Sequence, residues 1–199
     1  VFTIAFNGEI YNFAELRQDL VRKGAAFRST SDTEIILEAY RAWGTDCLAH
    51  LNGMFAFALY DSGQEVLLLA RDRAGEKPLF YHYAKGNFYF ASELKGLLAN
   101  PSFARRVDPV ALDCYLAMGY VPGEQCILEG FSKLPPAHAL LFNLRDGLLK
   151  TWRYWSLPEL IDERACGVMD ENAQIDELES LLETSVRRQL VADVPVGVL

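Results

Sequence analysis

A change of hydrophobic period near Gly53 is the feature that most restricts how this chain can fold. From Phe13 to Trp43 apolar residues recur at helical spacing, and after Gly53 short apolar runs alternate with turn residues. In the run 54–60 both faces of a strand would be mostly apolar, with Phe55 and Phe57 on one face and alanines on the other. A sheet that is apolar on both faces must be covered on both faces. We therefore expect an α+β fold, an αββα sandwich with helices on one side of this sheet and a second, mainly antiparallel sheet on the other.

Turn residues and helix caps divide the rest of the chain into elements. Strands are expected at 1–6, 54–60, 65–70, 79–83 and 87–91, with a further hairpin of 139–143 and 148–155. Helices are expected after the N-cap residues Asn12 and Ser31, ending at Gly24 and Gly44, and over 93–98, 109–118 and 175–190. The four strands from 54 to 91 follow one another through tight turns, which predicts an antiparallel meander. The polar stretch 156–172 predicts a linker, and 194–199 a last strand.

Composition argues against several classes of partner. The formal net charge is −8 and the lysines and arginines are scattered, so a nucleic-acid partner is not expected. No stretch approaches the roughly 20 apolar residues that a membrane span requires, so we expect no membrane contact and a cytoplasmic protein. The cysteines at 47, 114, 126 and 166 lack metal-ligand spacing and are expected to be reduced thiols. The histidines show no metal-site spacing either, and no metal site is predicted.

A candidate site lies where the first apolar run, 1–6, meets Asn7, Gly8 and Glu9. A strand that ends in Asn-Gly presents a side-chain amide and a backbone N–H at one place, and a developing oxyanion needs two such donors. Gly8 would also leave room for a substrate, because it has no Cβ. The same dipeptide is the commonest hairpin turn, so these residues alone leave both interpretations open.

The segment Arg71-Asp72-Arg73 with Lys77-Pro78 contains charged residues at a predicted turn. It lacks the glycine-rich spacing of a phosphate-binding loop. We interpret it as a structural hairpin that is fixed by pairing between arginine and aspartate. Glu93 and Lys95, at the start of a short predicted helix, are also interpreted as structural.

Five motifs in order carry a resemblance to a known family. They are Phe6-Asn-Gly-Glu-Ile-Tyr-Asn-Phe13, Ser31-Asp-Thr-Glu34, Gly53-Met-Phe-Ala-Phe-Ala58, Arg71-Asp-Arg73 with Gly75 and Lys77-Pro78-Leu79, and Ala91-Ser-Glu-Leu-Lys95. With this set the chain closely resembles the glutaminase domain of glutamine-hydrolysing asparagine synthetases, a class II glutamine amidotransferase domain of the N-terminal-nucleophile hydrolase type. The resemblance covers nearly the whole chain. It implies a glutaminase domain at 1–155 that lacks its N-terminal segment, a linker at 156–172, and at 173–199 the start of an ATP-dependent synthetase domain of the α/β ATP-pyrophosphatase type.

The resemblance also implies roles for individual residues. The Asn7 amide and the Gly8 N–H would be the catalytic oxyanion donors and would contact glutamine together with Glu9. Asp32 would receive the α-ammonium group of glutamine, and the backbone of Leu199 would contact the adenine of ATP. The intact enzyme would use ATP and Mg to amidate aspartate or a related carboxylate with ammonia from glutamine, whereas no cofactor is expected on these 199 residues. A homodimer stays open.

The chain departs from the family pattern at both ends. The family uses a cysteine at the mature N-terminus as its nucleophile, whereas residue 1 is Val, and the sequence stops before the family's Ser-Gly-Gly-x-Asp-Ser loop for ATP phosphates. We therefore expect a piece of a longer enzyme that does not itself hydrolyse glutamine. Two alternatives remain: a cysteine-less ATP-dependent ligase of the β-lactam synthetase type, and a non-catalytic module that senses glutamine or mediates assembly.

Overall fold

The computed structural model describes residues 1–157, 170–191 and 197. Its strands are β1 Phe2–Ile10, β2 Gly53–Asp61, β3 Val66–Arg71, β4 Phe80–Ala84, β5 Asn87–Ala91, β6 Ser132–Lys133, β7 His138–Asn143 and β8 Leu149–Arg153. Its helices are α1 Phe13–Arg22, α2 Asp32–Trp43, α3 Cys47–His50, α4 Leu94–Leu97, α5 Pro109–Met118 and α6 Glu171–Gln189, with a 3-10 turn at Gly44–Asp46. The chain divides into two compact units, Val1–Trp155 and Ser156–Leu199. The predicted last strand, 194–199, lies outside the described residues apart from residue 197.

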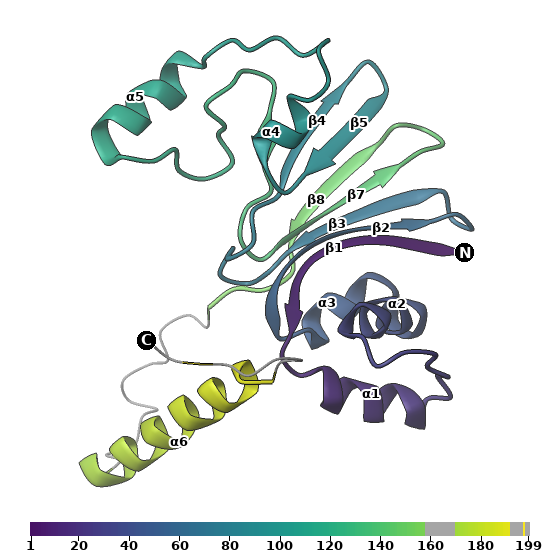
Figure 1. The fold of residues 1–199 in the computed structure, drawn as a ribbon, viewed down its shortest axis with the longest axis vertical. Coiled ribbons are helices and arrows are strands. Elements are labelled where there is room, and N and C mark those ends of the chain that lie inside the picture. The colour runs from purple at the N-terminus through teal and green to yellow at the C-terminus, as the bar shows by residue number, and fades with distance from the viewer. Residues whose placement is uncertain (158–169, 192–196, 198–199) are drawn as a thin grey trace. The chain divides into compact units, whose positions relative to one another are not determined.

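The first unit contains two antiparallel sheets, ordered β1-β2-β3-β7-β8 and β5-β4-β6. Helices α1–α3 cover one face of the larger sheet, where Phe55 and Phe57 enter the core. The smaller sheet covers the other face, where Ala56 and Ala58 lie. The outer face of the smaller sheet packs against α4 and the segment that follows it, through Leu97 and neighbouring apolar side chains. Figure 1 shows these layers in succession, and they confirm the αββα sandwich that the two-sided apolar pattern predicts.

The predicted meander of consecutive strands is wrong after β3. This strand pairs with β7 and not with β4, so the segment between β3 and β4 crosses to the smaller sheet. Asp72 is fully buried at this crossing. Its carboxylate accepts the backbone N–H groups of Glu76 and Lys77, both at 2.9 Å. These bonds satisfy the buried Asp72 carboxylate and hold the backbone of the crossing segment.

Arg71 stabilises the same crossing, although by a different contact from the one predicted. Its guanidinium donates to the backbone carbonyls of Gly75, Lys77 and Leu134, each at 2.7 Å. Within the described residues no ion pair joins Arg71 to Asp72. The motif is therefore structural, as expected, but it acts through the backbone of the crossing segment.

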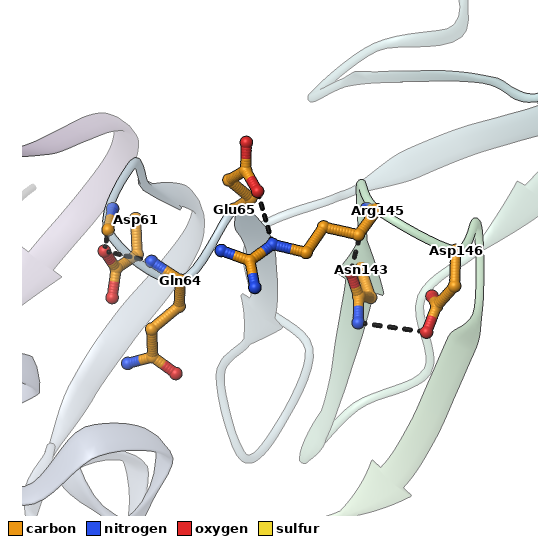
Figure 2. A network of polar contacts seen from close by, with 7 residues as sticks. Asp61, Gln64, Glu65, Asn143, Arg145 and Asp146 are labelled. Carbon is orange, nitrogen blue, oxygen red and sulfur yellow. Dashed lines mark hydrogen bonds and ion pairs between the residues drawn. The ribbon is translucent and has the colours of Figure 1, made fainter.

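Figure 2 shows a polar network that links the turn after β2 to the turn after β7. The Asp61 carboxylate accepts the N–H groups of Gly63 and Gln64 at 2.8 and 3.2 Å and shapes the first turn. Glu65, at the end of that turn, forms an ion pair with Arg145 of the second turn. An exposed pair of this kind adds little stability. Its position shows instead that the β3–β7 register brings these two turns together.

The first two helices begin where the sequence predicts, but only one of the predicted caps forms. Ser31 caps α2 by accepting the N–H of Thr33 at 3.1 Å. Asn12 makes no side-chain cap bond to α1. Its side chain instead donates to the carbonyl of His50 and accepts the N–H of Asn52, both at 3.0 Å. Asn12 therefore ties the end of β1 to the residues that lead into β2.

The buried Tyr40 hydroxyl and Cys47 thiol make the stability of the fold depend on pH in the alkaline range. Burial, with a smaller contribution from Asp61, raises the pKa of Tyr40 from 10.0 to about 12. Burial, with a smaller contribution from Asp46, raises the pKa of Cys47 from 9.0 to about 12. Because the unfolded chain ionises at the lower values, both groups contribute stability that is present below pH 9 and is lost as pH rises toward 12.

We therefore expect the free energy of unfolding to fall steadily from pH 9 upward in urea titrations made at successive pH values. Tyr40→Phe and Cys47→Ala should each make this fall less steep, because each removes one ionising group. Tyr120→Phe, at a tyrosine that is 60% exposed, is the control for the loss of a tyrosine hydroxyl. A profile that stays flat to pH 11 would contradict the assignment.

Candidate active site

Strand β1 continues through Asn7, Gly8 and Glu9 to Ile10, so the predicted end of this strand at residue 6 is wrong. All nine residues of β1 pair with β2, and Gly8 lies opposite Phe55. Gly8 has φ +151°, and a Cβ there would lie 2.1 Å from the carbonyl oxygen of Met54. The missing side chain is therefore required by the neighbouring strand, a reason different from the expected room for substrate. The hairpin-turn interpretation is removed.

The backbone N–H of Gly8 points toward the edge of the larger sheet. Phe55, opposite Gly8, uses both of its backbone groups on Asp72: its N–H donates to the carboxylate at 3.2 Å and its C=O accepts the Asp72 N–H at 2.8 Å. Directly opposed residues in an antiparallel pair exchange both bonds or neither. The Gly8 N–H and C=O therefore point away from β2. Among the described strands β1 is the outermost of its sheet, so this N–H lies at an open edge.

Asp32 lies on the same edge. Its Oδ2 accepts the N–H of Ile10 at 3.0 Å. Alternate residues of a strand point the same way, and the distance along the strand from Gly8 to Ile10 is about 7 Å. Asp32 is the first residue of α2, so a different element places this carboxylate on the same strand edge as the Gly8 N–H. A helix N-terminus stabilises a negative charge at this position.

The Asn7 side chain leaves the strand by the face that the smaller sheet covers. Asn7 pairs with Ala56, whose side chain belongs to the core between the sheets. The Asn7 side chain is exposed, and its Nδ2 donates to Oγ of Ser92 at 3.2 Å. The two candidate oxyanion donors therefore come from adjacent residues, one from the face of the sheet and one from its edge.

Glu9 is exposed on the same face as Asn7, two residues along the strand. Burial raises the pKa of the Tyr11 hydroxyl, and the negative charges of Glu76, Glu9 and Asp72 add to this effect. Glu76 belongs to the crossing between the two sheets, so the fold brings it close to the end of β1. The sequence analysis gave neither residue a role. Tyr11 lies three residues after Gly8 in the same motif, whereas Glu76 is distant in the sequence and no local pattern could have placed it there.

Other predicted features have plain outcomes. Cys47, Cys114 and Cys126 are free thiols, as expected, whereas Cys166 lies outside the described residues. Among the residues that the structure describes, no group of three His, Cys, Asp or Glu side chains could hold a metal ion. No described helix is both long enough and apolar enough to cross a membrane. Leu199, expected to contact ATP, lies outside the described residues.

The sandwich of two antiparallel sheets is a fold that a solved amidotransferase also has. The glutamine phosphoribosylpyrophosphate amidotransferase of B. subtilis, solved in complex with ADP and GMP, shares this fold with a TM-score of 0.52 at 20% identity. The similarity covers 77% of this chain and 29% of that one. The fold is thus that of the N-terminal-nucleophile hydrolase type of amidotransferase.

The chain belongs to the glutamine amidotransferase domain family, whose model matches residues 1–155. It is 43% identical to glutamine-hydrolyzing asparagine synthetase 3 of Bacillus subtilis (strain 168), over 98% of this chain and 31% of that protein. It is 35% identical to glutamine-hydrolyzing asparagine synthetase B of Escherichia coli (strain K12), over 98% of this chain and 29% of that protein. The chain therefore spans about 30% of the length of these curated relatives.

Proposed function

We propose that this chain is part of a longer glutamine-dependent enzyme of the asparagine synthetase type, in which residues 1–155 belong to the domain that hydrolyses glutamine to glutamate and ammonia. The observation that carries the proposal is the open edge of β1, where the Gly8 N–H lies beside the Asp32 carboxylate. This edge offers a hydrogen-bond donor and a negative charge about 7 Å apart along the strand. A glutamine molecule has complementary groups, a side-chain amide at one end and an α-ammonium at the other.

In this proposal each residue has one task. A thiolate adds to the amide carbon of glutamine, and the Asn7 amide and Gly8 N–H donate to the resulting oxyanion. Its collapse releases ammonia, and water then cleaves the thioester to give glutamate, so that the sum is glutamine plus water to glutamate plus ammonia. Asp32 holds the α-ammonium group and Glu9 lines the pocket. The thiolate would belong to a cysteine ahead of Val1, as the resemblance implies.

The remainder of the intact enzyme would use ammonia, ATP and Mg to amidate aspartate or a related carboxylate. We assign 156–172 to a linker and 173–199, with Leu199, to the start of that ATP-dependent domain. Support comes from α6, none of whose residues is buried and whose apolar stripe is more than half exposed at Ile175, Leu178 and Leu182. Such a stripe is typical of a helix that packs against further chain. We place the enzyme in the cytoplasm, and a homodimer stays open.

The charge of Asp32 can be tested separately from its structural bond. In the full-length protein, Asp32→Asn retains an oxygen that accepts the Ile10 N–H but removes the negative charge. We expect KM for glutamine to rise about tenfold to a hundredfold, because a charged hydrogen bond to the substrate is lost. Synthesis from added ammonia should be unchanged. Steady-state kinetics with glutamine and with ammonia measure both effects.

Asp108→Asn is the matched control, since Asp108 also accepts backbone N–H groups at the start of a helix, α5. It should leave both activities intact. Equal loss of both activities in Asp32→Asn would indicate misfolding and remove Asp32 from the glutamine site.

The proposed reaction itself is tested on the full-length protein by intact mass and by ammonia release from glutamine. An N-terminal cysteine together with ammonia release supports it. A protein that consumes ATP in ligation but never hydrolyses glutamine would instead be a cysteine-less ligase of the β-lactam synthetase type. Binding of glutamine without hydrolysis or ligation would indicate the sensing module.

A further inference from the structure

Asn7 needs support from outside its own strand to act as an oxyanion donor. It lies on the outermost strand of its sheet among the described residues, and its side chain is exposed. The terminal torsion of an asparagine takes a broad range of values, so an exposed position on the outermost strand does not by itself fix the direction of the amide. Ser92 directly follows β5 of the other sheet. Its Oγ accepts a hydrogen bond from Asn7 Nδ2 at 3.2 Å, and this bond fixes the direction of the amide.

Ser92 is well placed for this task because its own position is tightly defined. It is half-buried and follows directly after Ala91, the last residue of β5. Helix α4 begins two residues later and buries Leu97. A Cβ on Gly96 would lie 3.2 Å from the Cβ of Ala91, so α4 packs closely against the strand end. Ser92 therefore lies at a corner between a paired strand and a packed helix.

We propose that Ser92 is a positioning residue for glutamine hydrolysis, a role that rests on the proposed function of Asn7. The Asn7 amide carries two N–H groups. Ser92 Oγ accepts one of them, which leaves the second to donate to the oxyanion. Ser92 itself need not touch glutamine. This role predicts that the hydroxyl matters only while Asn7 is present.

The contact between Asn7 and Ser92 is tested first without an activity assay. NMR of the Asn7 side-chain amide is recorded on the 199-residue chain labelled with ¹⁵N-asparagine. Ser92→Ala should shift the Asn7 NH2 resonance, whereas Ser92→Thr, which keeps the hydroxyl, should restore it. Ser102→Ala is the matched control, because Ser102 also bonds an asparagine side chain, that of Asn100, at 2.8 Å. An Asn7 resonance that does not respond to Ser92→Ala would overturn the contact.

The role is tested by a double-mutant cycle in the full-length protein. We expect Ser92→Ala to lower kcat for glutamine hydrolysis about fivefold to tenfold, the effect of one lost hydrogen bond, with KM for glutamine little changed. Ser92→Thr should retain most of the activity. In the Asn7→Ala background Ser92→Ala should cost nothing further, because the side chain that it positions is already gone.

The outcomes are distinct. If Ser92→Ala lowers kcat equally with and without Asn7, Ser92 has a merely structural role and the inference is wrong. A wild-type kcat in Ser92→Ala overturns it as well. If the wild-type full-length protein releases no ammonia from glutamine, the proposed function fails and the positioning role fails with it, while the NMR result still decides whether the contact exists.

Discussion

Replacing Asn7 by alanine in the full-length protein should lower the turnover of glutamine hydrolysis by about a hundredfold or more. Loss of one oxyanion donor removes stabilisation from the transition state and not from bound substrate, so kcat falls and KM for glutamine stays nearly constant. The side chain is exposed and its strand partner Ala56 is small, so the fold should tolerate the change. Ammonia release under saturating glutamine measures the effect.

Asn87→Ala is the matched control for Asn7→Ala. Asn87 also lies on a strand, β5, and its Nδ2 donates to a nearby backbone carbonyl, that of Lys85, at 3.3 Å. We expect its variant to keep the wild-type rate. An unchanged rate in Asn7→Ala would remove Asn7 from the catalytic machinery. A lower rate accompanied by equal loss of ammonia-dependent synthesis would indicate a general structural defect.

Gly8→Ala should have a still larger effect, because it damages both the fold and the site. The new Cβ would lie 2.1 Å from the Met54 carbonyl oxygen and 2.7 Å from Cα of Phe55, both backbone atoms that cannot move aside. The strands β1 and β2 would have to separate at this point. We expect a loss of roughly 2–4 kcal/mol in the free energy of unfolding, from strain at an unusual φ together with overpacking. Glutamine hydrolysis should become undetectable.

Gly86→Ala separates the two causes. Gly86 also has a positive φ, +77°, but a Cβ there would have nothing within 4 Å. Its variant should lose only about 1 kcal/mol, the cost of the backbone conformation. Urea unfolding of both variants gives the difference. If Gly8→Ala is no less stable than Gly86→Ala, the close approach of β1 and β2 is not what the structure indicates.

The sequence alone predicts which faces of the strands are buried, but it does not predict where β1 ends. Phe55 and Phe57 alternate with Ala56 and Ala58, and this local pattern suffices to place helices on one side and a sheet on the other. The end of β1 depends on its partner β2, which begins 43 residues after Ile10 in the sequence, at Gly53. A short-range signal such as Asn-Gly indicates a turn only when no distant strand completes the pairing.

The topology also depended on contacts that are invisible in a local pattern. The segment between β3 and β4 has the composition of a hairpin turn, yet Asp72 and Arg71 hold it as a crossing between sheets through backbone groups. The candidate site also depends on a contact between segments that are distant in the sequence. Asn7, Gly8 and Asp32 were identified from their motifs, whereas Ser92 meets Asn7 only because two sheets pack together. The roles of these residues stay predictions.

The position of Asp32 also covers part of the edge of β1, the outermost strand of its sheet among those that the structure describes. An outermost strand offers a row of backbone donors and acceptors on which a strand of another copy can pair, which leads to aggregation. Here the Asp32 carboxylate already occupies the N–H of Ile10, two residues past Gly8. Glu9 adds a second negative charge at the same end of the strand. An incoming strand would have to displace the Asp32 carboxylate and pass the charge of Glu9.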